Sequence, residues 1–224
     1  MVDGGSTRRL PPGTLPARLA VPGGMSAPFQ PLVLSRPSVH VTACRGIEEL
    51  DEVFGSRGQA AHCWCQFDRL SVSEFEALDD EQRRDLLAVE LRRRPAPGVV
   101  ARLGTQPVGW CSVAPRTRFG RLRACASMTS SVTAGDDPGV WSVTCFVVRH
   151  GFRRRGVEQA LLAGAVEHAR SGGAGWLEGY PVDSDGRKAT PGELYRGTLA
   201  LFRAAGFEVV ARPRSGRAIV RLEL

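Results

Sequence analysis

The sequence contains no apolar run that approaches the roughly 18 residues of a membrane-spanning helix. Its first residues also lack the apolar core of a secretory signal peptide. We therefore expect a cytoplasmic protein with no membrane partner. In that compartment the six cysteines are expected to be thiols rather than disulfides.

Lysine is nearly absent, because arginine supplies almost all of the 30 basic residues. The formal net charge of +7 is compatible with a nucleic acid, an anionic membrane or a phosphorylated ligand as partner. The chain has no RNP-like, helix-turn-helix or zinc-finger signature, and acidic residues are interspersed through its predicted helices. These features argue against a nucleic-acid partner.

The N-terminal segment differs in composition from the rest of the chain. Residues 1–37 are rich in Pro, Gly and Ser and show no sustained periodicity. A segment of this kind cannot bury a core, which predicts a disordered tail at 1–37 before a single domain at 38–224.

Removal of residues 1–37 is therefore expected to leave the folding of residues 38–224 intact. The truncated chain should keep a cooperative melting transition at an unchanged temperature, and limited proteolysis of the full chain should trim this segment first. Calorimetry of both forms checks the prediction, and loss of the cooperative transition on truncation would contradict it.

The hydrophobic pattern beyond residue 38 predicts strands and helices in an order typical of a mixed sheet covered by helices. The largely apolar strand 140–148 is expected to be central and buried on both faces. The predicted strands are 39–45, a hairpin at 99–115, 140–148, 175–183, and a pair at 207–212 and 218–224. The predicted helices are 46–55, 71–94, 156–173 and 191–206.

The stretch "RHGFRRRGVEQALL" (149–162) follows the central strand directly and opens the next helix. The first backbone N–H groups of a helix lack intrahelical partners, and the helix dipole adds positive charge there. A preceding loop that turns its N–H groups inward forms an anion nest. Gly156 would allow a pyrophosphate to approach the backbone. The alternative is a solvated basic turn in which Gly156 is an ordinary loop glycine.

The same residues resemble the acetyl-CoA-binding motif of the GNAT N-acetyltransferases, Arg/Gln-x-x-Gly-x-Gly/Ala. Arg153 to Val157 fit the motif, whereas Glu158 stands where the family has Gly or Ala. "TQPVGWCSVAP" resembles the second–third strand hairpin of the family, and "LFRAAGFEVV" resembles its later signature. The three segments stand in the family's order across residues 39–224. "CWC", "WSVTCF" and "EGYP" resemble an actinobacterial-type subgroup of the family.

The resemblance implies an α/β fold with a mostly antiparallel sheet of six or seven strands, whose fourth and fifth strands splay apart. It implies transfer of an acetyl group from acetyl-CoA to an amine. We expect a primary amine of a small molecule, such as an antibiotic, an amino acid or a polyamine-like amine, and a protein N-terminus or lysine stays open as the acceptor. Pantetheine would lie against the fourth strand, and the loop after it would hold the pyrophosphate. The residues implied in acetyl-CoA binding are Phe146, Val147, Val148, Arg153, Arg154, Arg155, Gly156, Val157, Glu158 and Gln159.

Catalysis would need a group that accepts a proton from the amine and one that gives a proton to the thiolate. Glu178 is the candidate base, because an acid inside an apolar strand is costly unless it is paired or used. Its alternative is a carboxylate paired with an arginine. The family's usual acid, a tyrosine, is replaced by Phe202, which leaves Tyr195 as a catalytic candidate or as a packing residue.

Two further features concern the acceptor side. His62, Cys63 and Cys65 do not have the spacing of a four-ligand zinc site, so no metal is expected. By the resemblance, the first helices would wall the acceptor pocket, which makes Trp64 and Trp141 candidate substrate-binding aromatics or ordinary core residues.

Two alternatives to an enzyme remain open at the level of sequence. One is a GNAT fold that binds acyl-CoA as a sensor without turnover, which Glu158 and Phe202 both allow. The other is a basic module that binds nucleic acid. A homodimer is also open beside a monomer.

Overall fold

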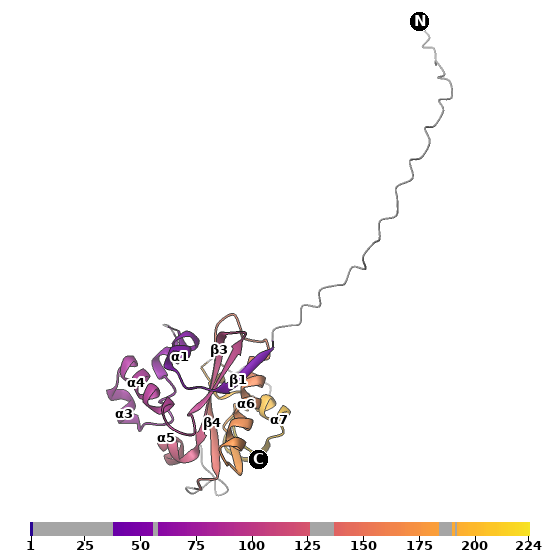
Figure 1. The fold of residues 1–224 in the computed structure, drawn as a ribbon. Helices are drawn as coiled ribbons and strands as arrows, with labels where there is room; N and C mark the ends of the chain where they lie inside the picture. The colour runs from indigo at the N-terminus through magenta and orange to yellow at the C-terminus, as the bar shows by residue number, and fades with distance from the viewer. Residues whose placement is uncertain (2–37, 56–57, 126–136, 184–189, 191) are drawn as a thin grey trace, which may run out of the picture. The chain divides into compact units, whose positions relative to one another are not determined.

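The apolar runs form a seven-stranded sheet in the spatial order β1–β2–β3–β4–β5–β7–β6 (Figure 1). Its neighbouring strands are antiparallel except for β4 and β5, which are parallel. The mixed, mostly antiparallel sheet predicted from the sequence is confirmed. The strands are β1 (Val39–Ala43), β2 (Gly98–Leu103), β3 (Gln106–Pro115), β4 (Val140–Val148), β5 (Trp176–Gly179), β6 (Glu208–Arg214) and β7 (Arg217–Glu223).

The computed structural model describes residue 1 and residues 38–55, 58–125, 137–183, 190 and 192–224. The predicted tail at 1–37 thus lies outside the described residues, apart from residue 1. Contacts group the chain from Arg36 to Leu224 into one compact unit.

Helices cover both faces of the sheet (Figure 1). Helix α6 packs on one face, over a core that includes Trp141, Phe146 and Phe202. The helices between β1 and β2 pack on the other face, around Trp110 and Trp64. The helices and 3-10 turns are α1 (Ile47–Phe54), α2 (Gln59–Cys63), α3 (Val72–Ala77), α4 (Asp80–Leu91), η1 (Arg116–Arg118), α5 (Gly120–Ala124), α6 (Val157–Ser171), η3 (Leu194–Arg196) and α7 (Leu199–Ala204).

The single helix predicted at 71–94 is wrong, because the chain forms α3 and α4 instead. Both begin with a capping box: Ser71 with Glu74 in α3, and Asp79 with Gln82 in α4. A capping box supplies partners for the first free N–H groups of a helix. The second box therefore starts a new helix at the point where Leu78 is extended.

The helix predicted at 191–206 is also divided in its described part. Gly197, at φ 73°, separates η3 from α7. Thr198 is extended, and its hydroxyl accepts a hydrogen bond from the Leu201 N–H, which caps α7. A Cβ on Gly197 would lie 3.2 Å from the Phe146 ring, so the break lets the chain pass close to β4.

Strand β5 is shorter than the predicted 175–183, since it ends at Gly179. Pro181 follows soon after and has no N–H to donate to a neighbouring strand. Beyond it, Val182 makes isolated bridges to Thr198 and Arg217. Among the described residues, the early end of β5 leaves the second half of β4 without a paired strand on this side, and we call this its free edge.

Candidate functional site

The free edge of β4 is the first feature of the site. Strand β5 pairs with β4 from Val140 to Val143 and no further. Beyond that point, no strand of the described residues pairs with β4 on this side. The Arg149 N–H donates to the Val108 carbonyl on the β3 side, at 3.0 Å. Because N–H groups alternate between the two edges of a strand, those of Phe146 and Val148 face the open edge.

A bulge occurs in β4 where this free edge begins. Ser112 of β3 pairs with Cys145, but the next residue, Val113, pairs with Val143, so Thr144 is the extra residue. Thr144 is buried and donates a hydrogen bond to the Ser112 hydroxyl at 3.2 Å. Bulges bend a strand and redirect its side chains, and they are frequent beside active sites. After the bulge, Cys145 and Val147 pack with the core on the α1–α4 face.

The loop between β4 and α6 has an unusual backbone. Gly151, Arg154 and Gly156 all have positive φ values, of 90°, 59° and 78°. Arg153, Arg154 and Arg155 are exposed. Arg153 also donates from Nε to the Val148 carbonyl at 3.3 Å, next to the open edge of β4.

Helix α6 begins directly after this loop. Gly156 is its N-cap and provides no side-chain acceptor. The first hydrogen bond of the helix runs from the Ala160 N–H to the Gly156 carbonyl, at 3.1 Å. The N–H groups of Val157, Glu158 and Gln159 therefore lack intrahelical partners. Together with the three arginines, they form a positively polarised end suited to an anion.

Glu158, the departure from the family motif, is half-buried at this end. Burial raises the pKa of its carboxyl group. Burial disfavours the charged form of this group, which is the form that would repel a bound phosphate.

Glu178 lies on β5, and its side chain is fully buried. Its Oε1 accepts from Nε of Arg221 at 2.7 Å, and its Oε2 accepts from the Tyr180 hydroxyl at 2.7 Å. Nη1 of Arg116 lies 3.7 Å from Oε2. This is the arginine-paired arrangement that the sequence left open. The catalytic role of Glu178 stays a prediction.

Tyr195 lies in η3 and not on α7. Its hydroxyl accepts from Nε of Arg196 at 3.0 Å. Burial is the main cause that raises the pKa of Tyr195, and the charge of Arg196 opposes the rise. Cys145 of β4 is close enough to affect the pKa of Tyr195 as well, which agrees with the packing of η3 on β4.

Phe202, in the position of the family's tyrosine, is a core residue. Its ring packs edge-on against Phe146 and Phe207, with centroids 6.1 Å and 5.0 Å away. A Cβ on Gly179 would come within 2.2 Å of this ring. The ring therefore fills the space beneath the point where β4 and β5 separate.

The structure does not bring Trp64 and Trp141 together, since they belong to cores on opposite faces of the sheet. Trp64 stacks on Phe54 at 4.8 Å and lines a hollow of about 390 Å³ with residues of α4. Trp141 is 2 % exposed and lies under α6, edge-on to His168. Trp64 thus lines a hollow although only 6 % of its surface is exposed, whereas Trp141 packs as a core aromatic.

The segment around Trp64 carries thiols. The Trp110 indole donates to the Cys65 sulfur at 3.2 Å. Burial is the main cause that raises the pKa of the Cys63 thiol, to about 12, so this thiol stays protonated at neutral pH. Within the described residues, no group of three His, Cys, Asp or Glu side chains is arranged to hold a metal ion.

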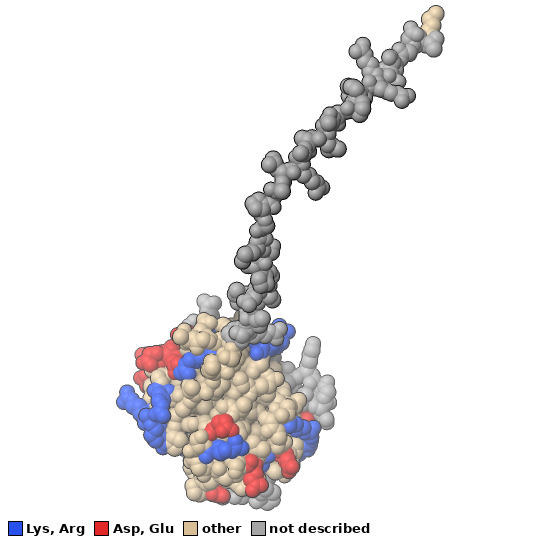
Figure 2. Space-filling view, turned by 45° about the vertical axis from the view of Figure 1, so that its right-hand side comes forward, with Lys and Arg blue, Asp and Glu red and all other residues tan. Residues whose placement is uncertain are grey.

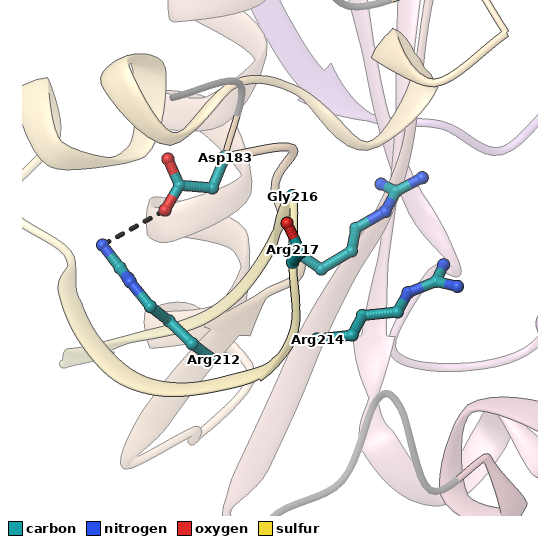
Figure 3. A pocket seen from close by; sticks show the side chains of 6 residues that line it. Asp183, Arg212, Arg214, Gly216 and Arg217 are labelled. Atoms are coloured by element: carbon teal, nitrogen blue, oxygen red, sulfur yellow. Dashed lines mark ion pairs between the residues drawn. The ribbon is translucent and has the colours of Figure 1, made fainter. Parts of the chain in front are cut away.

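Sequence reasoning missed a group of arginines near Tyr195. Arg196 is buried and donates from Nη2 to Asp68 at 2.5 Å. Arg217 begins β7, directly after a turn that the sequence presented simply as a hairpin connection. Nothing in the local pattern marks these arginines, because their partners are distant in the chain. The turn also lines a polar hollow of about 320 Å³ (Figure 3).

The sequence matches the profile of the acetyltransferase (GNAT) family over residues 63–189, which is more than half of the chain. This chain belongs to the GNAT family. The family assignment agrees with the sheet order, the free edge of β4 and the glycine at the start of α6. The actinobacterial-type subgroup suggested by the sequence stays a prediction.

Solved structures of GNAT proteins resemble the chain at low sequence identity. The PaiA N-acetyltransferase of Thermoplasma acidophilum, solved with coenzyme A, is 13 % identical at a TM-score of 0.49, over 84 % of this chain and 99 % of that one. YncA of Salmonella typhimurium, described as a putative acetyltransferase and solved with acetyl-CoA, is 13 % identical at a TM-score of 0.46, over 83 % and 94 %. No curated protein matches the sequence significantly.

Among the described residues, no helix has both the length and the apolar character needed to cross a membrane.

Proposed function

We propose that this GNAT protein transfers the acetyl group of acetyl-CoA to a primary amine of a small molecule. The observation that carries the proposal is the adjacency of two features, the free edge of β4 and the positively polarised start of α6. A pantetheine arm contains amide groups that can pair with a strand edge, and its pyrophosphate suits a helix N-terminus. A single acyl-CoA molecule would use both features at once.

The residues assigned to acetyl-CoA follow from these two features. The backbone groups of Phe146 and Val148 face the open edge, and Val147 lies between them. Gly156 suits the pyrophosphate, because a Cβ there would meet no atom of the chain closer than 3.6 Å. The space beside it is thus free for a ligand. The remaining residues assigned to the pyrophosphate are Arg153, Arg154, Arg155, Val157, Glu158 and Gln159.

Acetyl-CoA would supply an acyl carbon activated by its thioester. As the amine nitrogen forms a bond to this carbon and the bond to sulfur breaks, the amine loses one proton and the sulfur gains one. We assign to Tyr195 the role of giving the sulfur its proton. Its hydroxyl accepts from Arg196, so its own proton is free to be donated. The raised pKa keeps Tyr195 protonated at neutral pH.

Glu178 is the predicted proton acceptor, but its burial and its bonds favour a different role. The Tyr180 hydroxyl lies between Glu178 and Ser142 of β4, at 2.7 Å and 3.0 Å. Glu178 thereby ties β5 to β4 next to the point where the strands separate. We therefore infer that Glu178 positions the strands, and that a water chain takes the proton of the amine.

Two features support an enzyme rather than a nucleic-acid-binding module. The basic side chains on the face in Figure 2 lie beside acidic ones and do not form one continuous patch. The arginines of the β4–α6 loop adjoin a strand edge, a feature with no use in binding phosphates along a nucleic acid. A cytoplasmic location and a monomer or homodimer are part of the proposal. A sensor without turnover is its alternative.

Acetyl-CoA at one hundred times its dissociation constant is expected to stabilise the protein by about 2.7 kcal/mol. For a chain of this size, that corresponds to a melting shift of roughly 5–11 °C. Gly156→Ala should abolish most of the shift, because the added Cβ would occupy the space beside the pyrophosphate. Differential scanning fluorimetry with and without acetyl-CoA measures it.

Gly173→Ala is the matched control. Gly173 follows the far end of α6 and has a φ of 82°, close to the 78° of Gly156. Both variants therefore strain the backbone alike, but Gly173→Ala should keep the full acetyl-CoA shift. If acetyl-CoA gives no shift and the protein binds DNA or RNA in a salt-sensitive way, the proposal is wrong. Release of free thiol with an amine panel separates an enzyme from a sensor.

A further inference from the structure

Two arginines near Tyr195 have buried nitrogen atoms without a hydrogen-bond partner. Nη1 of Arg196 and Nη1 of Arg217 are both inaccessible to solvent and unpaired within the described chain. A buried donor that lacks a partner destabilises a protein, and a charged donor does so more strongly than a neutral one. Such groups are rare in native proteins, and a ligand that accepts from them is one explanation.

Arg196 is held rigidly, with 3 % of its surface exposed. Its Nη2 bonds to Asp68 at 2.5 Å and its Nε bonds to the Tyr195 hydroxyl at 3.0 Å, so Nη1 is the nitrogen that remains. Its guanidinium carbon lies 5.9 Å from the centre of the Tyr180 ring. Arg196 is therefore beside the paired part of β4 and β5, not at the start of α6 where the pyrophosphate would bind.

Arg217 reaches the same region from the other side of the β4–β5 separation. Its backbone bridges to Val182, which also bridges to Thr198 behind η3. Its side chain and that of Arg214 extend in the same direction, whereas Arg212 turns the opposite way and pairs with Asp183 at 3.1 Å (Figure 3). Burial lowers the pKa of Arg217, and the nearby charges of Arg196 and Arg214 lower it further.

The local balance of charge is positive. Arg196 is paired with the acid Asp68. A second acid, Glu193, is close enough for its charge to affect Arg217. Arg214 and Arg217 add two further positive charges. Arginine favours carboxylates as partners, and each of these two arginines has an Nη1 whose N–H groups lack an acceptor.

We infer that Arg196 and Arg217 bind a carboxylate of the acceptor, which makes the acceptor an amino acid or a close derivative of one. The inference rests on the proposed acetyl transfer, and it names the substrate class of that same site. Tyr195 connects the two parts, because its hydroxyl bonds to Arg196 and η3 packs on β4. A carboxylate at the arginines would place a nearby amine beside the free edge of β4.

The test compares L-amino acids with their α-amides, which have the same amine and side chain but no carboxylate. With wild-type protein and acetyl-CoA, the best amino acid should exceed its amide by at least about 30-fold in kcat/KM, as expected when a site is built around a charged group. Arg217→Gln should reduce this ratio to near 1. Arg212→Gln, the same change on the same hairpin, should leave the ratio unchanged.

Melting temperatures separate binding from a structural role. Arg217→Gln removes an unpaired buried donor that the charges of Arg196 and Arg214 also repel. The melting temperature of this variant should therefore equal or exceed that of wild type. A structural role predicts a lower melting temperature and an unchanged ratio. Equal use of amino acids and amides by the wild-type protein, or a ratio that survives Arg217→Gln, would overturn the inference.

The failure of this inference differs from that of the proposed function. Missing stabilisation by acetyl-CoA refutes the proposed function. In that case the melting temperatures of wild type, Arg217→Gln and Arg212→Gln are measured with amino acids and with their amides. Stronger stabilisation by the amino acid that is lost in Arg217→Gln alone would still show that Arg217 selects a carboxylate. If acetyl-CoA binds but no amino acid is acetylated or stabilises the protein in an Arg217-dependent way, the carboxylate site is wrong and acetyl-CoA binding stands.

Discussion

Replacing Tyr195 by phenylalanine is expected to lower kcat about 100-fold and to leave acetyl-CoA binding almost unchanged. A general acid typically contributes about 10²–10⁴ in rate, and the lower end suits a departing thiolate that water can also protonate. Among the described residues the hydroxyl has one hydrogen-bond partner, Arg196 at 3.0 Å, so its removal takes away little support from the fold. Steady-state release of free thiol and the acetyl-CoA melting shift measure the two quantities.

The pH dependence carries a sign that follows from the raised pKa of Tyr195. An acid must be protonated to act, so the wild-type rate should not fall through this group below about pH 10, the ordinary pKa of tyrosine. Tyr195→Phe should therefore lower the rate by the same factor across the neutral range.

Tyr180→Phe is the contrasting variant, since the chain has just two tyrosines. Its hydroxyl is buried between Glu178 and Ser142, so its loss should lower stability by about 1–3 kcal/mol through unpaired buried groups. Its effect on kcat should be far smaller than that of Tyr195→Phe. If Tyr195→Phe keeps the wild-type kcat, or loses stability instead of rate, Tyr195 is a packing residue.

Features set by short stretches of sequence could be predicted. The 99–115 hairpin, the central strand 140–148 and the helix after Gly156 each depend on residues close together in the chain. An apolar run and a glycine at the head of a helix are sufficient signals for these elements. They are also the features that position acetyl-CoA in the proposal, which explains why the family could be recognised from the sequence.

Features set by distant contacts could not be predicted. Arg196 is fixed by Asp68, which is 128 residues away, and Glu178 is paired with Arg221, 43 residues away. The break at Gly197 depends on close packing against Phe146. Local periodicity contains no information on such contacts, so the sequence predicted one helix at 191–206 and did not mark the arginines near Tyr195.

Glu178→Gln is expected to destabilise the protein by about 3 kcal/mol, the lower end of the range for breaking a buried ion pair. Glu178 is fully buried, and the side chains of its partners Arg221 and Arg116 are 14 % and 5 % exposed. Glutamine preserves the shape but removes the negative charge that faces these two guanidinium groups. The melting temperature should fall by roughly 6–12 °C, which calorimetry measures.

Glu167→Gln provides the matched exposed pair. Glu167 bonds to Arg170 at 2.5 Å on the surface of α6, with 68 % of its side chain exposed. Because solvent screens such a pair, the same change of charge should alter the melting temperature little.

Activity then decides between the two roles of Glu178. If Glu178 ties β5 to β4, the folded Glu178→Gln enzyme should lose a modest part of its kcat, and this loss should not depend on pH. A general base would instead contribute about 10²–10⁴, and the loss on substitution would shrink at high pH, where the amine arrives already deprotonated. A pH–rate profile measured well below the melting temperature of the variant separates the two. A loss of that size that recovers with rising pH would place Glu178 in the proton transfer and contradict the structural assignment.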